Sequence, residues 1–439
     1  MCHSALFCFM VLPLLKGDFK VTIWKPNSFT NPPIFAFPSI LNFLVFPRFA
    51  FISDRIALIF QNPSFVTTFF RNFAPMIIGY DAKRIVRNGT GLGSYARTLV
   101  NDLIVKKPAD TRLLLYSPDM GRDDLRSQIN EGVEWHYEEK FAPLIPKGIQ
   151  KAYWRTHSIV KDLKRDKVEI FHGLSGELPI GLRKAGIRGV VTIHDLIFMR
   201  HPEWYNPIDV KFYTWKFYKT VQEADRIIAI SECTKRDIME LGGVEEERID
   251  LIYQSYSPKF KDGSAGTQGY EGVQRYVLYV GTVEERKNLL LAVKALDMLP
   301  EDIHLVAVGR LTDYAKRIPH HERLHLLGQL PLEELTALYA GAEAFVYPSR
   351  YEGFGIPIIE AISSGLPVVA CTGSCLEEAG GPDCLYVNPD DHVALADALR
   401  SVLKGADSRE ERIRKSREYI RRFEGGDVAS QVLDVYQNL

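Results

Sequence analysis

From Met76 to the C-terminus, short apolar runs alternate with amphipathic stretches, and this alternation limits the possible folds more than any other feature. Short apolar runs bounded by polar turns are typical of buried strands, and amphipathic stretches are typical of the helices that connect parallel strands. The pattern therefore predicts an α/β fold with parallel sheets. We expect strands at residues 77–80, 112–116, 168–172, 189–193, 226–230, 248–252, 276–280, 304–308, 324–327, 344–347 and 367–370.

The alternation stops between Ser257 and Gln274, in a stretch rich in Gly, Ser, Lys and Pro. Such a composition is typical of an interdomain linker. We therefore expect two Rossmann-like domains facing each other across a cleft, residues 76–256 and residues 275–439, with terminal helices in the second. In such sheets ligands bind outside the carboxyl ends of the strands, so functional residues are expected in the loops that follow strands.

Residues 1–75 differ from the rest of the chain. They contain 15 of the 24 phenylalanines, six Lys or Arg, two acidic residues and no Glu. Their two apolar stretches, 5–15 and 33–46, are shorter than the ~20 residues that a membrane helix needs, and the first lacks the basic region of a signal peptide. The segment is interpreted as a membrane-associating leader, an additional capping element, or translated sequence upstream of the true start. The last is favoured because Met76 directly precedes the first strand.

Charge and cysteine content argue against two classes of protein. The formal net charge is −1, so the chain lacks the excess of Lys and Arg that general nucleic-acid binding requires. None of the six cysteines forms the paired C-x-x-C motif of a zinc or redox site. Free thiols indicate a reducing compartment, so we expect the protein in the cytoplasm, with the inner face of the membrane as a further possibility.

The strongest functional signal is a strand–loop–helix segment that contains two glutamates. A strand ends at Tyr347, a glycine loop with Glu352 follows, and a helix begins near Ile356 with Pro357 in its first turn. Glycines allow a backbone to approach a ligand closely, and a helix N-terminus attracts an anion such as a diphosphate. Glu360, about one turn into the helix, would accept hydrogen bonds from sugar or ribose hydroxyls.

Beyond its first 75 residues, the chain resembles a family 4 retaining glycosyltransferase with the GT-B fold, because Glu352 and Glu360 match the E-x7-E motif of that family. The resemblance implies that Glu360 holds the donor ribose and that Glu352 lies near the donor sugar. It also implies that backbone N–H groups at Gly353, Phe354 and Gly355 meet the donor sugar and its diphosphate.

A second segment supports this resemblance. Arg286 and Lys287 are adjacent cations at the start of an expected helix, an unfavourable position unless an anion neutralises them. The family has an E-P-R-K-N-like stretch there, and the resemblance implies that Arg286 and Lys287 clamp the donor diphosphate. Glu285 stands where the family often has Pro. An Arg and a Lys both stabilise the negative charge that grows on a leaving diphosphate.

Three glycines are further candidates for donor binding. Gly91 and Gly93 belong to a glycine loop after the first strand, and the resemblance places this loop over the donor diphosphate. By itself the loop also suits a dinucleotide site. Gly328 follows a later strand, where the family uses backbone groups to hold the nucleobase.

Two histidines end strands of the first domain. His194 would hydrogen-bond a donor-sugar hydroxyl or the acceptor, with Asp195 orienting its ring, and the resemblance to an H-D element of the family supports this role. His172 either faces the cleft or packs as a structural residue. Ser231 is expected to cap the N-terminus of the helix that follows it.

The resemblance implies a retaining enzyme that moves a hexose, with mannose favoured, from a nucleotide-sugar donor to a glycan or lipid-linked glycan acceptor. A lipid-linked acceptor would fit a peripheral association with a membrane. The chain has no D-x-D triplet, the metal-binding motif of the other large glycosyltransferase fold. We therefore expect no metal and no cofactor.

Three other interpretations remain open from the sequence. A sugar-nucleotide 2-epimerase shares the fold and binds a similar donor. A degenerate transferase would serve as a non-catalytic scaffold, although its donor-site residues would then be expected to change. A dinucleotide-dependent oxidoreductase is supported only by the glycine loop after the first strand.

Overall fold

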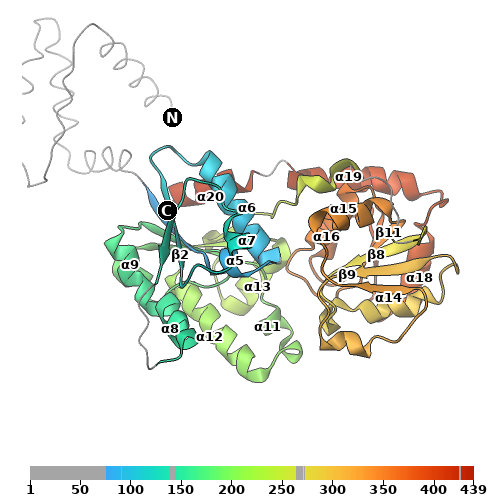
Figure 1. The fold of residues 1–439 in the computed structure, drawn as a ribbon, viewed down its shortest axis with the longest axis horizontal. Helices are drawn as coiled ribbons and strands as arrows, with labels where there is room; N and C mark the ends of the chain where they lie inside the picture. Colours follow the sequence, from blue (N-terminus) through green and yellow to red (C-terminus); the bar gives the residue numbers. More distant parts are fainter. Residues whose placement is uncertain (1–75, 90, 139–144, 264–269, 271, 425–426) are drawn as a thin grey trace, which may run out of the picture. The chain divides into compact units, whose positions relative to one another are not determined.

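The computed structural model describes residues 76–439 apart from residue 90 and residues 139–144, 264–269, 271 and 425–426. These residues belong to one compact unit, Pro75–Leu439. The three interpretations of residues 1–75 therefore concern residues outside the described part of the chain. The structure confirms the α/β class, with two parallel sheets that are each covered by helices (Figure 1).

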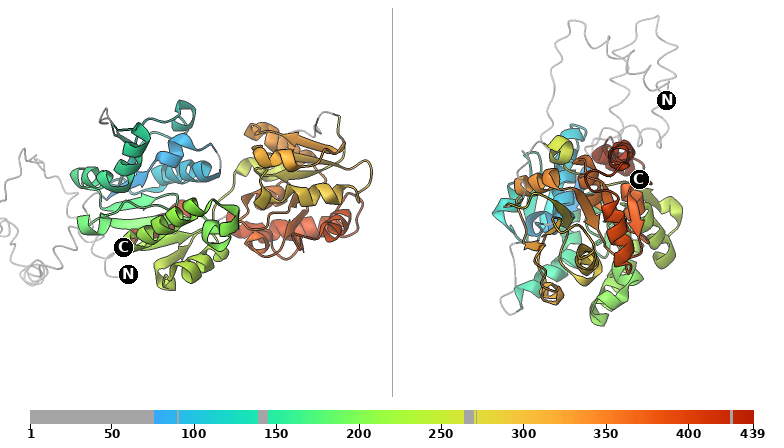
Figure 2. Two further views of the ribbon diagram at one scale, coloured as in Figure 1. Left: turned by 90° about the horizontal axis from the view of Figure 1, so that it is seen from below. Right: turned by 90° about the vertical axis from the view of Figure 1, so that its right-hand side faces the viewer.

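The first lobe is built on a seven-stranded parallel sheet with the strand order β3-β2-β1-β4-β5-β6-β7. The central strand β1 pairs with β2 and β4, and its residues are all buried because helices cover both faces of the sheet (Figure 2). Consecutive apolar residues suit strands that are covered on both faces. The strands are β1 (Ile77–Asp81), β2 (Arg112–Ser117), β3 (Glu134–Tyr137), β4 (Ile170–Gly173), β5 (Arg188–Ile193), β6 (Arg226–Ala229) and β7 (Ile249–Leu251).

The second lobe is built on a six-stranded parallel sheet with the order β10-β9-β8-β11-β12-β13. The strand order reverses beside β8, which pairs with β9 on one side and with β11 on the other. Loops at such a reversal form a crevice at the carboxyl ends of the strands. The strands are β8 (Tyr276–Val280), β9 (His304–Val308), β10 (Leu324–Leu327), β11 (Ala344–Tyr347), β12 (Val368–Cys371) and β13 (Leu385–Val387).

Helices connect the strands of both sheets. In the first half of the described chain they are α5 (Lys83–Arg87), α6 (Gly91–Lys106), α7 (Asp123–Arg126), α8 (Lys147–Tyr153), η3 (Trp154–Ser158), α9 (Ile159–Arg165), α10 (Leu182–Ala185), α11 (Ile197–Arg200), η4 (Pro202–Trp204), α12 (Pro207–Glu223), α13 (Glu232–Gly242), η5 (Glu246–Arg248) and η6 (Pro258–Gly263). The second half contains η7 (Glu285–Lys287), α14 (Leu289–Leu296), η8 (Asp313–Arg317), α15 (Leu332–Gly341), α16 (Ile356–Ser363), α17 (Leu376–Gly380), α18 (His392–Arg400), α19 (Arg409–Glu424) and α20 (Val428–Gln437). Within the described residues, no helix combines the length and the apolar character that crossing a membrane requires.

The eleven predicted strands are confirmed, with ends that differ by at most two residues from those in the structure. The sequence analysis missed β3 and β13. Strand β3 reads Glu-Trp-His-Tyr and lies at the edge of its sheet, so it lacks the apolar run that marks a buried strand. Strand β13 has only three residues, too few to show a period.

Two features near the predicted domain boundaries differ from expectation. Part of the predicted linker is the short helix η6, whose Phe260 is buried and packs edge-on against Tyr339 with ring centroids 5.1 Å apart. The last helix, α20, was assigned to the second domain but packs on the first lobe, with Val432 and Tyr436 in the core beside β1. An amphipathic pattern predicts a buried helix face but does not say which core receives it.

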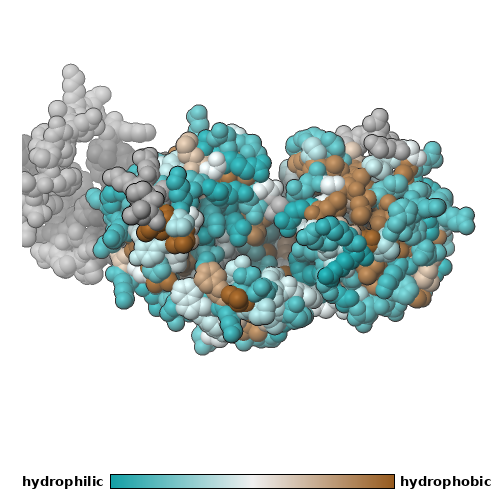
Figure 3. Space-filling model, turned by 60° about the horizontal axis from the view of Figure 1, so that its bottom comes forward, coloured by the Kyte–Doolittle hydropathy of each residue, from teal (hydrophilic) through white to brown (hydrophobic). Residues whose placement is uncertain are grey.

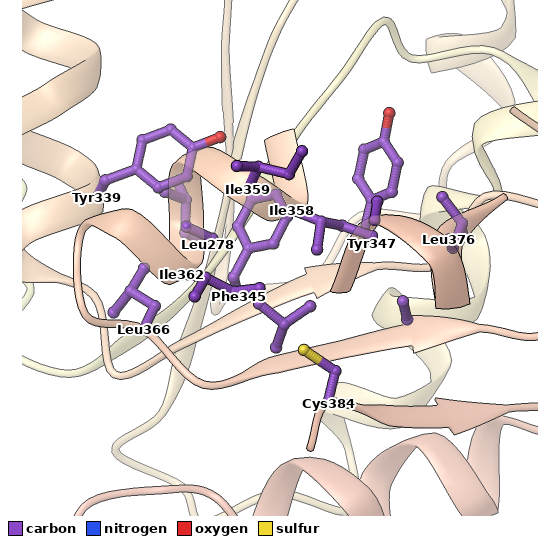
Figure 4. Packing of buried hydrophobic residues seen from close by; sticks show 14 of the residues in the cluster. Leu278, Tyr339, Phe345, Tyr347, Ile358, Ile359, Ile362, Leu366, Leu376 and Cys384 are labelled. Carbon is purple, nitrogen blue, oxygen red and sulfur yellow. The ribbon is translucent and has the colours of Figure 1, made fainter. Parts of the chain in front are cut away.

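The core of the second lobe fixes the helix that carries Glu360. Three isoleucines of α16, Ile358, Ile359 and Ile362, are buried against Phe345 and its neighbours on the sheet (Figure 4). Because these side chains occupy one face of the helix, its rotation is set by packing. Glu360 is thereby directed away from the core.

Candidate active site

A cleft of about 690 Å³ is lined by loops and helix ends of both lobes. Figure 3 shows the side of the molecule on which the two lobes meet. The predicted site residues that line the cleft are His194, Arg286, Lys287, Glu352, Gly353, Phe354, Gly355, Glu360 and Gly91. Gly93 and Gly328 are not among its lining residues. The structure therefore brings together nine of the eleven residues that were predicted separately along the chain.

The loop between β11 and α16 has the local form that the sequence predicts. Gly355 has a φ of +114°, a conformation that is strained for residues with a side chain, and it precedes the first residue of α16. Pro357 lies in the first turn of that helix, where its missing N–H costs no hydrogen bond. The N-terminus of α16 is thereby presented to the cleft.

Glu352 is held between the two predicted cations. Its carboxylate lies 2.5 Å from Lys287 Nζ and 3.0 Å from Arg286 Nη1, and the residue is buried. Burial alone would raise the pKa of Glu352, but Lys287 and Arg286 outweigh it and lower the pKa to about 2. The carboxylate is therefore ionised at neutral pH.

Both cations are also fixed by other groups. Arg286 donates to Glu284 Oε1 at 2.8 Å and to the Tyr351 carbonyl oxygen at 2.6 Å, and Lys287 donates to the Tyr347 hydroxyl at 2.9 Å. Two carboxylates and two cations make a cluster of balanced formal charge. The cations are therefore preorganised for an anion without being left as unpaired buried charges.

Glu360 has a different environment from Glu352. Its Oε2 accepts a hydrogen bond from the Tyr339 hydroxyl at 3.3 Å. Burial raises the pKa of Glu360 to about 7, and the hydrogen bond from Tyr339 opposes this shift only in part. The two glutamates of one motif thus differ in charge behaviour, because only Glu352 has cations beside it.

The ring of His194 is held by groups on two sides. Its Nε2 donates to the Leu174 carbonyl oxygen at 3.0 Å, because a carbonyl can only accept, and its Nδ1 then accepts from the Gln254 side-chain amide at 2.8 Å. Burial lowers the pKa of His194 to about 4, so the ring is neutral at pH 7. A substrate hydroxyl would reach a ring nitrogen only if Gln254 turned away.

The expectation that Asp195 orients His194 is wrong. Asp195 Oδ1 instead accepts from the backbone N–H of Ile197 at 3.2 Å and so stabilises the turn into α11. The orienting role falls to Gln254, which sequence reasoning missed. Gln254 lies just after β7, so the rule that sites gather beyond strand ends would have included it.

His172 is a structural residue. It is fully buried, and its ring nitrogens bond to the hydroxyls of Tyr436 and Thr192 at 2.6 and 2.9 Å. Because Tyr436 belongs to α20, His172 joins the C-terminal helix to the first sheet.

A glycine is present at each predicted position for a different physical reason. A Cβ atom on Gly353 would lie 2.1 Å from the carbonyl oxygen of His194, so a glycine is needed where the two lobes touch. Ser231 Oγ donates to the Gly353 carbonyl oxygen at 2.6 Å across the same contact, and it also caps α13 as predicted. Gly91 has open space beside it at the cleft.

Two of the predicted glycines do not line the cleft. A Cβ atom on Gly93 would lie 1.8 Å from the Asn88 carbonyl oxygen, so this glycine allows the chain to pack within the first lobe. Gly328 is exposed beyond β10, and its carbonyl oxygen accepts from the N–H of Gly309 at 3.2 Å. Sequence spacing could not separate a glycine needed for packing from one that faces a ligand.

No metal centre is evident in the part of the chain that the structure describes. Among those residues, no group of three or more His, Cys, Asp and Glu side chains is arranged to hold a metal ion. The positive groups that face the cleft are Arg286, Lys287 and the helix N-termini. The cleft is therefore chemically suited to a ligand that has both an anionic group and an uncharged polar group.

Comparisons with known proteins agree with this geometry. Residues 90–259 match the family model described as glycosyltransferase family 4, and residues 268–419 match the model described as glycosyl transferases group 1. The chain is 27% identical over 374 residues to O-antigen chain mannosyltransferase B of Escherichia coli, which covers 80% of this chain and 96% of that relative. It is 27% identical over 249 residues to O-antigen chain mannosyltransferase RfbU of Salmonella typhimurium, covering 55% of this chain and 67% of the relative.

Solved structures confirm the fold. Sucrose-phosphate synthase from Thermosynechococcus elongatus superimposes with a TM-score of 0.65 at 19% identity, covering 83% of this chain and 98% of that one. The structural neighbours have the GT-B fold, and the two lobes described above correspond to it. The expected arrangement of two Rossmann-like units is therefore confirmed.

Proposed function

Because this chain belongs to the family 4 glycosyltransferases, we propose that it transfers mannose from a nucleotide-sugar donor to a glycan or lipid-linked glycan acceptor, with retention of anomeric configuration and without a metal. Hexose transfer is the activity that the family and the relatives support. The names of the two bacterial relatives support mannose among the hexoses.

The observation that carries the proposal is the cluster of Arg286, Lys287 and Glu352, which lines the same cleft as the first residues of α16. A donor diphosphate brings negative charge, and the leaving nucleoside diphosphate brings more as the bond to the sugar breaks. Arg286 and Lys287 stabilise that charge, and the positive N-terminal end of the α16 dipole adds to this stabilisation. This stabilisation is the basis for proposing a metal-independent reaction.

The glutamates serve different parts of the donor. We assign Glu360 to the ribose hydroxyls, which would replace the solvation that burial removes from its carboxylate. We assign Glu352 to the donor sugar beside the diphosphate. The neutral His194 lies on the opposite lobe, so it would contact the sugar or the acceptor when Gln254 releases its Nδ1.

The acceptor and the cellular location are part of the proposal. The names of the two bacterial relatives indicate O-antigen chains as their acceptors. These names support the proposal that the acceptor of this chain is a growing glycan. We place the enzyme in the cytoplasm at the inner face of the membrane, where a lipid-linked acceptor would be accessible.

A direct test is calorimetric titration of the full chain with GDP-mannose, UDP-glucose, UDP-galactose and NAD. The proposal predicts that GDP-mannose binds and that Glu360→Ala weakens this binding at least tenfold. Tight binding of a UDP-sugar instead would contradict mannose as the transferred sugar. Binding of NAD alone would contradict a transferase site.

The products separate transfer from the other possible reactions. A transferase releases GDP only as it forms a glycoside, whereas a 2-epimerase changes the sugar at C2 and needs no acceptor. A non-catalytic scaffold would bind the donor and convert none of it.

A further inference from the structure

Helix α12 (Pro207–Glu223) exposes large apolar side chains on its outward face. Ile208 is 77% exposed, Phe212 49% and Trp215 44%. Their spacing of four and three residues places them along one side of the helix. Tyr218, which is also exposed, lies at the border of this row. We call Ile208, Phe212, Trp215 and Tyr218 the outward face of α12.

Lysines accompany this row. At 100° per residue, Lys211 and Lys219 fall on the same side of the helix as Trp215. Lys216 lies at the edge, with its Nζ 4.9 Å from the centroid of the Phe212 ring and 3.0 Å from Glu177 Oε2. Of the acidic residues of the helix, Asp209 lies off the row. Glu223 falls on the same side as Phe212, but its carboxylate accepts hydrogen bonds from the backbone N–H groups of Gly181 and Arg183. The outward face therefore combines aromatic and positively charged groups.

The opposite side of α12 is already used for packing. Phe217 and Thr220 are buried, and Phe217 belongs to the core of the first lobe. Tyr213 and Lys216 line a second cavity of about 230 Å³, together with His194. His194 also lines the main cleft, so α12 is next to the site in which an acceptor would meet the donor.

Exposure of the outward face of α12 to water is unfavourable. Contiguous apolar groups on a protein surface normally mark a contact with a partner or a membrane. Aromatic residues prefer the boundary between lipid headgroups and acyl chains, and lysines among them attract anionic headgroups. Figure 3 shows hydrophobic residues among hydrophilic ones at the surface of this side of the molecule.

We propose that α12 lies in the surface of an anionic lipid bilayer, with Phe212 and Trp215 entering the headgroup region and Lys211 and Lys219 contacting lipid phosphates. The importance of this surface for catalysis rests on the proposed lipid-linked acceptor. The docking itself needs no turnover, so its failure can be distinguished from a failure of the proposed function.

The test is co-sedimentation of the full chain with vesicles of phosphatidylcholine and with vesicles that also contain phosphatidylglycerol. We expect binding to the anionic vesicles that decreases as salt is added. Phe212→Ser combined with Trp215→Ser should weaken binding roughly tenfold or more, because the apolar surface that enters the bilayer is lost. Lys211→Ala and Lys219→Ala should each weaken it about fivefold.

A matched control uses exposed apolar residues elsewhere. Val105 and Val393 are 77% and 45% exposed and lie on α6 and α18 regions far from α12 in sequence. Val105→Ser combined with Val393→Ser should leave vesicle binding unchanged. All variants should unfold at the same urea concentration as the wild type, which shows that each has folded.

A local measurement shows whether α12 itself touches lipid. It is made in a Trp24→Phe background, so that residues 1–75 carry no tryptophan. With brominated lipids in the vesicles, tryptophan emission of the bound wild type should be quenched, and Trp215→Phe should remove most of that quenching while the protein stays bound. Unchanged quenching in Trp215→Phe would overturn the proposal. So would equal vesicle binding by the Phe212→Ser and Trp215→Ser variant, or a dimer in solution that this variant dissociates, because α12 would then be a protein interface.

Discussion

The hydroxyl of Tyr351 donates a hydrogen bond to Asp237 Oδ2 at 2.7 Å, and this bond joins the loop that carries Glu352 to helix α13 of the first lobe. Asp237 is buried, and its Oδ1 accepts from Arg200 at 2.6 Å. The carbonyl oxygen of Tyr351 accepts from Arg286. Tyr351, the neighbour of Glu352, thus links the second lobe to the first and also contacts Arg286, a residue that we propose binds the diphosphate.

Replacing Tyr351 by Phe tests this connection. The change keeps the ring but leaves one oxygen of buried Asp237 without its donor, so we expect a loss of about 1–3 kcal/mol in the free energy of unfolding. We also expect kcat to fall more than KM changes, because Glu352 and Arg286 would be less well positioned. Urea unfolding and steady-state kinetics measure the two effects.

Tyr218→Phe is the matched control, because the Tyr218 hydroxyl donates to the Leu241 carbonyl oxygen in an exposed position. It should change the free energy of unfolding by no more than about 0.5 kcal/mol. If Tyr351→Phe behaves like this control in both measurements, the contact has no positioning role.

Lys287→Ala should reduce kcat/KM by about 10²–10³, because it removes a charge that is aimed at the leaving diphosphate. It also leaves Glu352 with Arg286 as its remaining cation, so the pKa of Glu352 should rise. Lys294→Ala, at an exposed position of α14, should retain wild-type kinetics. Wild-type turnover by Lys287→Ala would remove this residue from the diphosphate site.

Glu360 predicts a specific dependence of stability on pH. Its pKa is about 7 in the folded protein and 4.5 ordinarily, so the unfolded chain loses this proton first as the pH rises. Between about pH 4.5 and pH 7 the folded state holds more protons than the unfolded state, and Glu360 therefore makes the protein less stable as the pH rises through this window. Above pH 7 both states are ionised and the cost is constant.

Urea unfolding at pH 5, 6, 7 and 8 measures this effect. Relative to the wild type, Glu360→Gln should gain stability across the window and no further above it. A constant difference between the two proteins over the whole range would show that Glu360 ionises normally.

The same group predicts how donor binding varies with pH. An ionised carboxylate accepts hydrogen bonds from ribose hydroxyls better than a protonated one, so the affinity for GDP should rise as the pH increases from 6 to 8. Glu360→Gln should show a flatter profile in the same calorimetric titration. Parallel profiles for the two proteins would place the ribose elsewhere.

Metal independence is tested by chelation. Since Arg286, Lys287 and the α16 N-terminus are proposed to meet the diphosphate charge, turnover should persist in excess EDTA and change less than about twofold when Mg²⁺ or Mn²⁺ is added. Loss of turnover in EDTA and its recovery with either metal would contradict the proposal.

The sequence predicted the residues that follow strands better than the contacts among them. Glu352, Glu360, Arg286 and Lys287 were found because parallel strands place the loops after them at one edge of a sheet. The ion pairs of Glu352 with both cations join segments more than sixty residues apart, and no local pattern predicts such a pairing.

Packing between distant segments explains the other differences. Gln254 takes the orienting role expected of Asp195 because the loop after β7 reaches His194 in the folded chain. Position 93 needs a glycine because a side chain there would clash with the carbonyl oxygen of Asn88. A glycine pattern alone does not show whether the close neighbour is the protein backbone or a ligand. The placement of α20 on the first lobe likewise depends on the shapes of two cores and not on the helix pattern.

The central claim is that this cleft transfers mannose with retention. The most direct measurement is proton NMR of a mixture of the full chain, GDP-mannose and octyl α-mannoside, followed through the anomeric signals. The account predicts equal amounts of released GDP and of a new α-linked mannoside. The account would be contradicted by a β-linked product or by a sugar changed at C2. It would also be contradicted if the protein bound GDP-mannose but left it intact.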